Sequence, residues 1–109
     1  MRSGRVRPVI KLSVCYQTPN DPAAFDAHYL GTHMPLCDTL PGIVRSEVTK
    51  YTGSLDGSTP PYYLQTDLVF ETQDALMAAL GSPAGAALVA DMANLQGTAT
   101  VVSVGTIAR

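Results

Sequence analysis

The chain has 109 residues, the length of one ordinary domain. Seven Lys and Arg against nine Asp and Glu give a formal charge of −2, and three of the basic residues fall within the first seven positions. Nucleic acids are bound by clustered basic side chains, so no nucleic-acid partner is expected. No apolar run approaches the roughly 20 residues of a membrane helix, and no convincing signal cleavage site is present. We therefore expect a cytoplasmic protein that does not associate with membranes.

The cysteine and histidine content gives no support for a metal or nucleotide cofactor. Only two cysteines are present, Cys15 and Cys37, and without a secretory signal both are expected to be reduced thiols. Cys37 follows His33 by four residues, a spacing at which both lie on one helix face, but zinc needs three or four ligands. No glycine-rich phosphate loop is visible. The sequence thus predicts no metal and no cofactor.

Residues 1–8 are expected to be a flexible leader, followed by a single domain over residues 9–109. The segment "VIKLSVCYQ", residues 9–17, alternates apolar and polar residues and predicts a strand. Ile10, Leu12, Val14 and Tyr16 share one face of that strand.

A helix is predicted to follow, capped by Asn20 or Asp21, with Pro22 in its first turn. Its apolar stripe consists of Phe25, Tyr29, His33 and Leu36, spaced as on one helical face. Gly31 and Pro35 both weaken a regular helix, so a kink or a new turn is expected near His33. His28 lies off the stripe and is expected to be a solvated or interface residue without a functional role.

The remaining segments predict strands over residues 43–51, 62–71 and 98–107 and helices over residues 73–80 and 83–95, with Thr72 and Ser82 as helix caps. The order strand, helix, strand, strand, helix, strand indicates an α+β fold, the ferredoxin-like βαββαβ arrangement with an antiparallel sheet and both helices on one face. The other sheet face is predicted to be polar, and two copies pressed together would enclose it. It would carry Lys11, Ser13, Cys15, Arg45, Glu47, Thr49, Tyr63, Gln65 and Asp67.

Four segments, in this order and spacing, resemble the EthD family over residues 9–107. They are "DPAAFDAHYLGTHMPL", "LPGI", "DLVF" and "SPAGAALVADMANL". The resemblance implies a ferredoxin-like protomer, a homodimer whose sheets meet as a dimeric α+β barrel, and a cavity between sheet and helices. Wider relatives on this fold include cofactor-free monooxygenases, isomerases and decarboxylases or dehydratases, so the fold does not fix the reaction.

The candidate catalytic residues are His33, Tyr29 and Asp91. Histidine side chains exchange protons near neutral pH, as a proton-transferring enzyme requires. The alternative for His33 is a hydrogen bond that fixes the end of the helix. Tyr29 is either a packing residue or a proton donor to a ligand carbonyl. Asp91 resembles an aspartate of the family's last helix segment and either anchors that helix or orients His33.

The candidate substrate-binding residues are Tyr16, Phe25 and Tyr63, which would form the wall for a flat aromatic ligand. The alternative for the tyrosines is strand propensity alone.

Three functions stay open at this stage. The protein is an enzyme that moves protons on an apolar aromatic or lactone-type metabolite through His33, or performs oxidative chemistry on it. Alternatively it is a non-catalytic accessory protein that binds such a metabolite. The third function is a scaffold dimer whose cavity is filled by its own side chains, which the absence of a pocket of roughly 300 Å³ or more would favour.

Overall fold

The computed structural model of the protein describes residues 9–95, 98 and 100–109, so the predicted leader lies outside the described residues. Four strands form one antiparallel sheet in the order β2-β3-β1-β4. Their bounds are β1 Val9–Tyr16, β2 Ile43–Lys50, β3 Leu64–Phe70 and β4 Thr100–Ile107. The helical segments are α1 Pro22–His28, η1 Tyr29–His33, α2 Met34–Asp38, α3 Gln73–Leu80, α4 Pro83–Asp91 and η2 Met92–Asn94.

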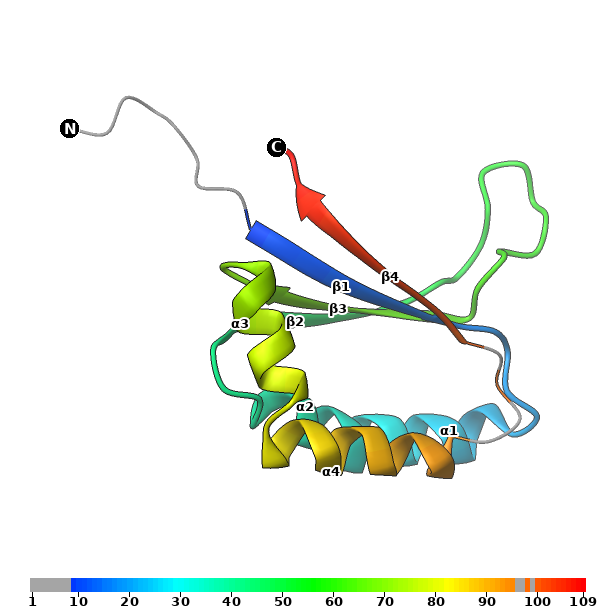
Figure 1. The fold of residues 1–109 in the computed structure, drawn as a ribbon. Coiled ribbons are helices and arrows are strands. Elements are labelled where there is room, and N and C mark those ends of the chain that lie inside the picture. Colours follow the sequence, from blue (N-terminus) through cyan, green and yellow to red (C-terminus); the bar gives the residue numbers. More distant parts are fainter. Residues whose placement is uncertain (1–8, 96–97, 99) are drawn as a thin grey trace.

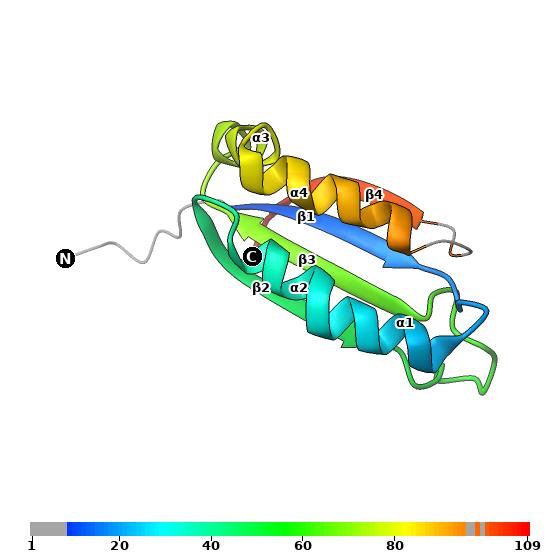
Figure 2. The ribbon, with the colours of Figure 1, turned by 90° about the horizontal axis from the view of Figure 1, so that it is seen from below.

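All helices lie on one face of the sheet, as Figures 1 and 2 show from two directions. The α1–α2 segment runs alongside α4 (Figure 2), and both lie below the strands in the view of Figure 1. Strand order, antiparallel pairing and helix placement confirm the predicted ferredoxin-like α+β fold.

The first helical segment has the predicted cap and the predicted irregularity. Asp21 accepts a hydrogen bond from the Ala24 N–H, and Pro22 occupies the first turn. Because Pro35 has no N–H for the carbonyl of Gly31, one α-helical hydrogen bond is missing here. The predicted kink takes the form of a π turn, η1, between α1 and α2.

The core lies between the sheet and the helices. It contains the apolar side chains of β1 and β3 that face the helices, among them Leu12, Tyr16, Leu64, Leu68 and Phe70. Within the described residues no single helix is long and apolar enough to cross a membrane. Only α3 together with residues 83–94 reaches that length, as a pair bent by 71°.

The opposite sheet face carries polar side chains, as the alternation predicts. Asp67 on β3 lies there and is buried. Its carboxylate accepts hydrogen bonds from Ser13 Oγ at 2.6 Å and from Gln65 Nε2 at 3.1 Å. Lys11 Nζ lies 3.7 Å from the same carboxylate.

The placement of Tyr63 on that polar face is wrong. Its ring packs edge-on against Phe25 at 6.1 Å, and its hydroxyl donates to Asp26 at 2.8 Å, so it lies on the helix side. Tyr63 precedes the regular part of β3, which begins at Leu64, and strict alternation does not extend to that position.

Candidate functional site

An apolar cavity of about 210 Å³ lies between the sheet and the helices. Most of its walls are aliphatic side chains. At its mouth, Val89 of α4 and Val102 of β4 are 61% and 57% exposed, so the cavity opens beside the edge strand. Its lining is Leu12, Val14, Tyr16, Tyr29, His33, Cys37, Thr66, Leu68, Leu80, Leu88, Val89, Met92 and Val102. The sequence resemblance implied a cavity in this place.

His33 and Asp91 meet at the edge of this cavity. His33 comes from the π turn and Asp91 from the end of α4, and their side chains are 3% and 8% exposed. His33 Nδ1 lies 2.7 Å from Asp91 Oδ2. The two helical segments therefore bring together the pair that the sequence analysis proposed as a histidine and its orienting carboxylate.

His28, expected to be a solvated or interface residue, contacts the same carboxylate as His33. His28 Nε2 lies 2.9 Å and 3.0 Å from the two oxygens of Asp91, and Asn94 Nδ2 donates to Asp91 Oδ1 at 2.9 Å. The reason is the π turn: its hydrogen bonds join residues five apart, so residues 28 and 33 lie on the same side of the helix. A regular α-helix would separate them.

The Asp91 carboxyl group is ionised at neutral pH. Burial alone would raise its pKa, but the hydrogen bonds from Asn94, His33 and His28 outweigh burial and lower the pKa to about 2. A carboxylate has no proton to give, so each histidine nitrogen that faces it must be the donor. The neutral form of His33 therefore carries its proton on Nδ1 and leaves Nε2 as the acceptor.

This lowered pKa predicts a specific acid sensitivity. A carboxyl group whose folded-state pKa lies near 2, below its ordinary value of 3.8, stabilises the fold above the ordinary value. Its contribution is lost as the pH falls from about 4 toward 2. Urea unfolding measured across this range should show a shallower loss of stability for Asp91→Asn, which does not titrate, than for the wild type. Equal slopes would contradict the assignment.

Tyr29 packs against His33 inside the cavity wall. Their rings stack with centroids 5.0 Å apart, and the Tyr29 hydroxyl is hydrogen-bonded to Thr66 Oγ1. Burial raises the pKa of Tyr29, and burial raises that of Tyr16 as well, so both hydroxyls keep their protons. Tyr16 lines the same cavity, with its ring edge-on to Tyr29.

The buried pair of Tyr29 and Thr66 makes a double-mutant test. Tyr29→Phe or Thr66→Val alone breaks this hydrogen bond between two buried hydroxyls, and each should lower the free energy of unfolding by about 1–3 kcal/mol. The double variant removes both polar groups and should lose less than the sum of the two single losses. Urea denaturation of the four proteins measures this coupling; strict additivity would show that the hydroxyls do not interact.

Phe25 and Tyr63 do not line the apolar cavity. Phe25 stacks on Tyr29 at 5.3 Å and faces an outer cleft instead. Tyr63 belongs to a contact that ties α1 to the end of β2: its hydroxyl and Lys50 Nζ both donate to Asp26, at 2.8 Å and 2.6 Å. Of the three predicted ligand-wall residues, only Tyr16 reaches the cavity.

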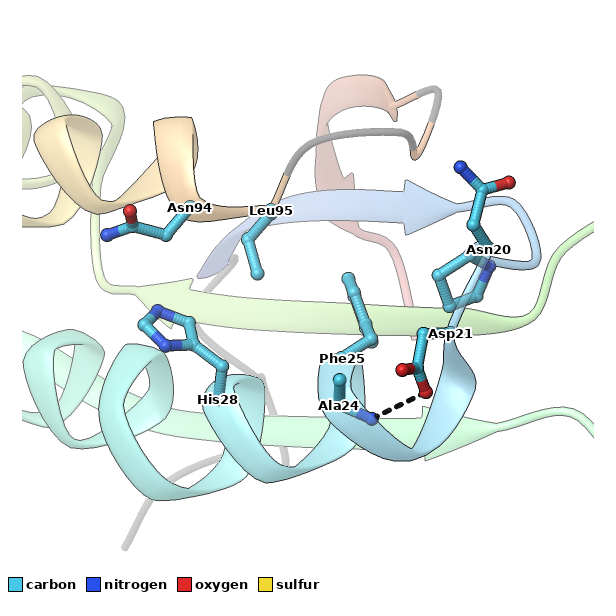
Figure 3. A pocket seen from close by; sticks show the side chains of 8 residues that line it. Asn20, Asp21, Ala24, Phe25, His28, Asn94 and Leu95 are labelled. Atoms are coloured by element: carbon cyan, nitrogen blue, oxygen red, sulfur yellow. Dashed lines mark hydrogen bonds between the residues drawn. The ribbon is translucent and has the colours of Figure 1, made fainter.

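The outer cleft, of about 200 Å³, lies between the start of α1 and the end of η2. Figure 3 shows His28 and Asn94 pointing toward one another across it, with Phe25 and Leu95 beside them. Since both His28 and Asn94 contact Asp91, this carboxylate lies between the outer cleft and the cavity that His33 lines.

Cys37 also lines the cavity, and it is buried. Burial raises the pKa of its thiol to about 12, so it stays protonated and is a poor nucleophile at neutral pH. Among the described residues, no group of three or more His, Cys, Asp and Glu side chains is arranged to hold a metal ion.

Comparison with known proteins places the chain in a family. The model of the EthD domain matches residues 17–98. An uncharacterized 11.0 kDa protein from the thcB–thcC intergenic region of Rhodococcus erythropolis is 39% identical over 84 residues, covering 77% of this chain and 81% of that protein.

Solved structures agree with this relationship. An EthD family protein from Bacillus halodurans is 31% identical, with a TM-score of 0.82 over 89% of this chain and 96% of that one. SnoaB, a cofactor-independent oxygenase from Streptomyces nogalater, shares the fold at 17% identity, with a TM-score of 0.67 over 95% of this chain and 96% of that one. From the family match and these relatives, this chain belongs to the EthD family.

Proposed function

We propose that this protein binds a small, uncharged, largely apolar molecule in its cavity and moves a proton on it through His33, without a metal or nucleotide cofactor. The observation that carries this proposal is the buried pair of His33 and Asp91 at the wall of an apolar cavity. With Nδ1 on the carboxylate, Nε2 is the ring nitrogen left for a ligand.

The lining indicates the class of ligand. Among the residues that the structure describes, no Lys or Arg side chain contributes to the cavity wall, so a carboxylate or phosphate would find no opposite charge from them. The volume of about 210 Å³ is below the roughly 300 Å³ at which ligand pockets usually begin. A bound molecule is therefore small, or extends outward past the exposed side chains of Val89 and Val102.

The chemistry is general base catalysis. His33 Nε2 takes a proton from an acidic C–H or O–H group of the ligand, and the resulting imidazolium keeps its hydrogen bond to ionised Asp91. The same base serves an isomerisation or the deprotonation that precedes reaction of a quinol with dioxygen. The fold shared with SnoaB, which is described as a cofactor-independent oxygenase, makes the quinol case worth testing first.

The experiment incubates the purified wild type and His33→Ala with a panel of quinols and lactones and follows their absorption spectra. Progressive substrate loss with the wild type, at least about 100-fold slower with His33→Ala, supports the proposal. Thr32→Ala is the matched control, because Thr32 is an exposed residue of the same π turn and should keep wild-type rates. Equal rates in wild type and His33→Ala would refute a role for His33 as the base.

The second candidate is a binding protein without catalysis. It is favoured by the hydrogen bond between the Tyr29 and Thr66 hydroxyls, because a Tyr29 hydroxyl engaged with Thr66 is less available as a proton donor to a ligand. A stoichiometric bound spectrum that does not change with time would support this function. If no panel compound binds and the cavity is occupied by its own side chains in solution, the scaffold function is supported instead.

We also propose that the protein is a cytoplasmic homodimer joined through the polar sheet face. The buried Asp67 carboxylate and its contacts with Ser13 and Lys11 support this, because this network lies on the sheet face that none of the described helices covers. The free thiols Cys15 and Cys37 are consistent with a reducing compartment. Light scattering should give twice the mass of one chain, and the mass of one chain would contradict the dimer.

A further inference from the structure

The carboxylate of Asp91 is held from three sides. His33 contacts Oδ2 and Asn94 contacts Oδ1, whereas His28 Nε2 lies almost equally far from both oxygens, at 2.9 Å and 3.0 Å. A donor placed across both oxygens opposes rotation of the carboxylate out of its plane, which a donor to a single oxygen does less well.

We propose that His28 is a positioning residue of the site: it holds the Asp91 carboxylate so that Oδ2 stays on His33 Nδ1 and Nε2 stays open to the ligand. This inference rests on the proposed function of His33. It assigns His28 to the site although His28 lies on the far side of Asp91 from the apolar cavity.

His28 does not line that cavity and so does not touch a ligand bound there. Its side chain is 30% exposed and borders the outer cleft, where Figure 3 shows it turned toward Asn94. The effect of His28 on chemistry must therefore pass through Asp91. The hydrogen bond made by one ring nitrogen of a histidine sets its tautomer, and the residues that hold the hydrogen-bonding carboxylate in place support that choice.

The test reads the tautomer of His33 directly, without any ligand. Long-range proton–nitrogen NMR spectra of the ¹⁵N-labelled protein, recorded on the basic side of the imidazole transition that the spectra themselves reveal, distinguish Nδ1–H from Nε2–H in the neutral ring. We expect the Nδ1–H form in the wild type. His28→Leu, which has no donor, should shift the ratio toward Nε2–H by about fivefold, the size expected for one lost hydrogen bond. His28→Gln, whose Nε2–H₂ group replaces the donor, should restore the wild-type ratio.

Two further variants keep the result interpretable. His28→Phe retains a ring without the donor and should behave like His28→Leu, which covers the case of a poorly folded leucine variant. Ala27→Leu adds bulk at an exposed neighbouring position and should leave the ratio unchanged. A folded His28→Leu or His28→Phe protein with the wild-type tautomer ratio would overturn the inference, as would a His28→Gln protein that shifts as far as His28→Leu.

The same data separate this inference from the proposed function. The tautomer is read in the free protein, so it can depend on His28 even if the substrate panel shows that His33 is not a base. Conversely, turnover could require His33 while the His33 tautomer ratio stays the same in the His28 variants. That result would support the proposed function and contradict a positioning role for His28.

Discussion

Replacing Asp91 by leucine is expected to lower the free energy of unfolding by about 3 kcal/mol, because it breaks a buried polar network by removing its central member. His33 is 3% exposed, and Asp91 is the acceptor of its Nδ1–H. Without that acceptor the buried Nδ1–H of His33 has no hydrogen-bond partner, and no new hydrogen bond offsets the free energy lost when this group leaves water. Urea denaturation followed by circular dichroism measures the change.

The control is Asp74→Leu, at an exposed position in the first turn of α3. Its loss should stay within about 0.5 kcal/mol, the usual range for a surface substitution. If the two leucine variants were equally stable, the hydrogen bonds around Asp91 would contribute little to the free energy of unfolding.

The sequence and its family resemblance offered the pairing of Asp91 with His33 as one of two alternatives for Asp91, but they did not indicate His28 as a neighbour of the pair. His33 was found from the apolar stripe of a regular helix, and that same regular spacing put His28 on the wrong side. The helix widens by one residue between them, and a π turn aligns residues five apart. Two histidines five residues apart with Gly31 and Pro35 close by are the signal that would have indicated this.

Alternation along the strands predicted which of their residues share a sheet face, and the observed register keeps those faces together, because a slip by one residue would exchange the buried and polar faces. Leu12 on β1 pairs with Leu68 on β3, both facing the helices, while Ser13 pairs with Asp67 on the other face. The prediction was wrong for Tyr63 because this residue lies one position before β3 begins. At the end of a strand the backbone departs from regular geometry, so alternation does not predict which sheet face a side chain occupies.

The size of the cavity could not be predicted from residue types. The same aliphatic side chains either fill the space between sheet and helices or leave it open, depending on how far the helices extend along the sheet. Here β4 is one of the two edge strands, and its Val102 and Val104 remain about half exposed on the face that the helices cover elsewhere. That incomplete cover gives the cavity its mouth.

The second large effect is expected at Gly85, in the first turn of α4. A Cβ atom there would overlap the backbone carbonyl oxygens of Ala79 and Leu80, at the corner where α3 gives way to α4. Backbone atoms cannot turn aside as a flexible side chain can, so Gly85→Ala should lower the free energy of unfolding by about 3 kcal/mol. The expected direction is opposite to that of an ordinary glycine-to-alanine change in a helix, which stabilises it.

Gly31→Ala is the matched control, because Gly31 is also helical and a Cβ atom there would meet nothing within 4 Å. That variant should be neutral or more stable by up to about 1 kcal/mol. Since α4 carries Asp91, a shift of α4 away from α3 in Gly85→Ala should also move the carboxylate relative to His33. The His33 tautomer should therefore change in Gly85→Ala. Equal stability of the two alanine variants would mean that α4 does not pack against the end of α3 as closely as this arrangement requires.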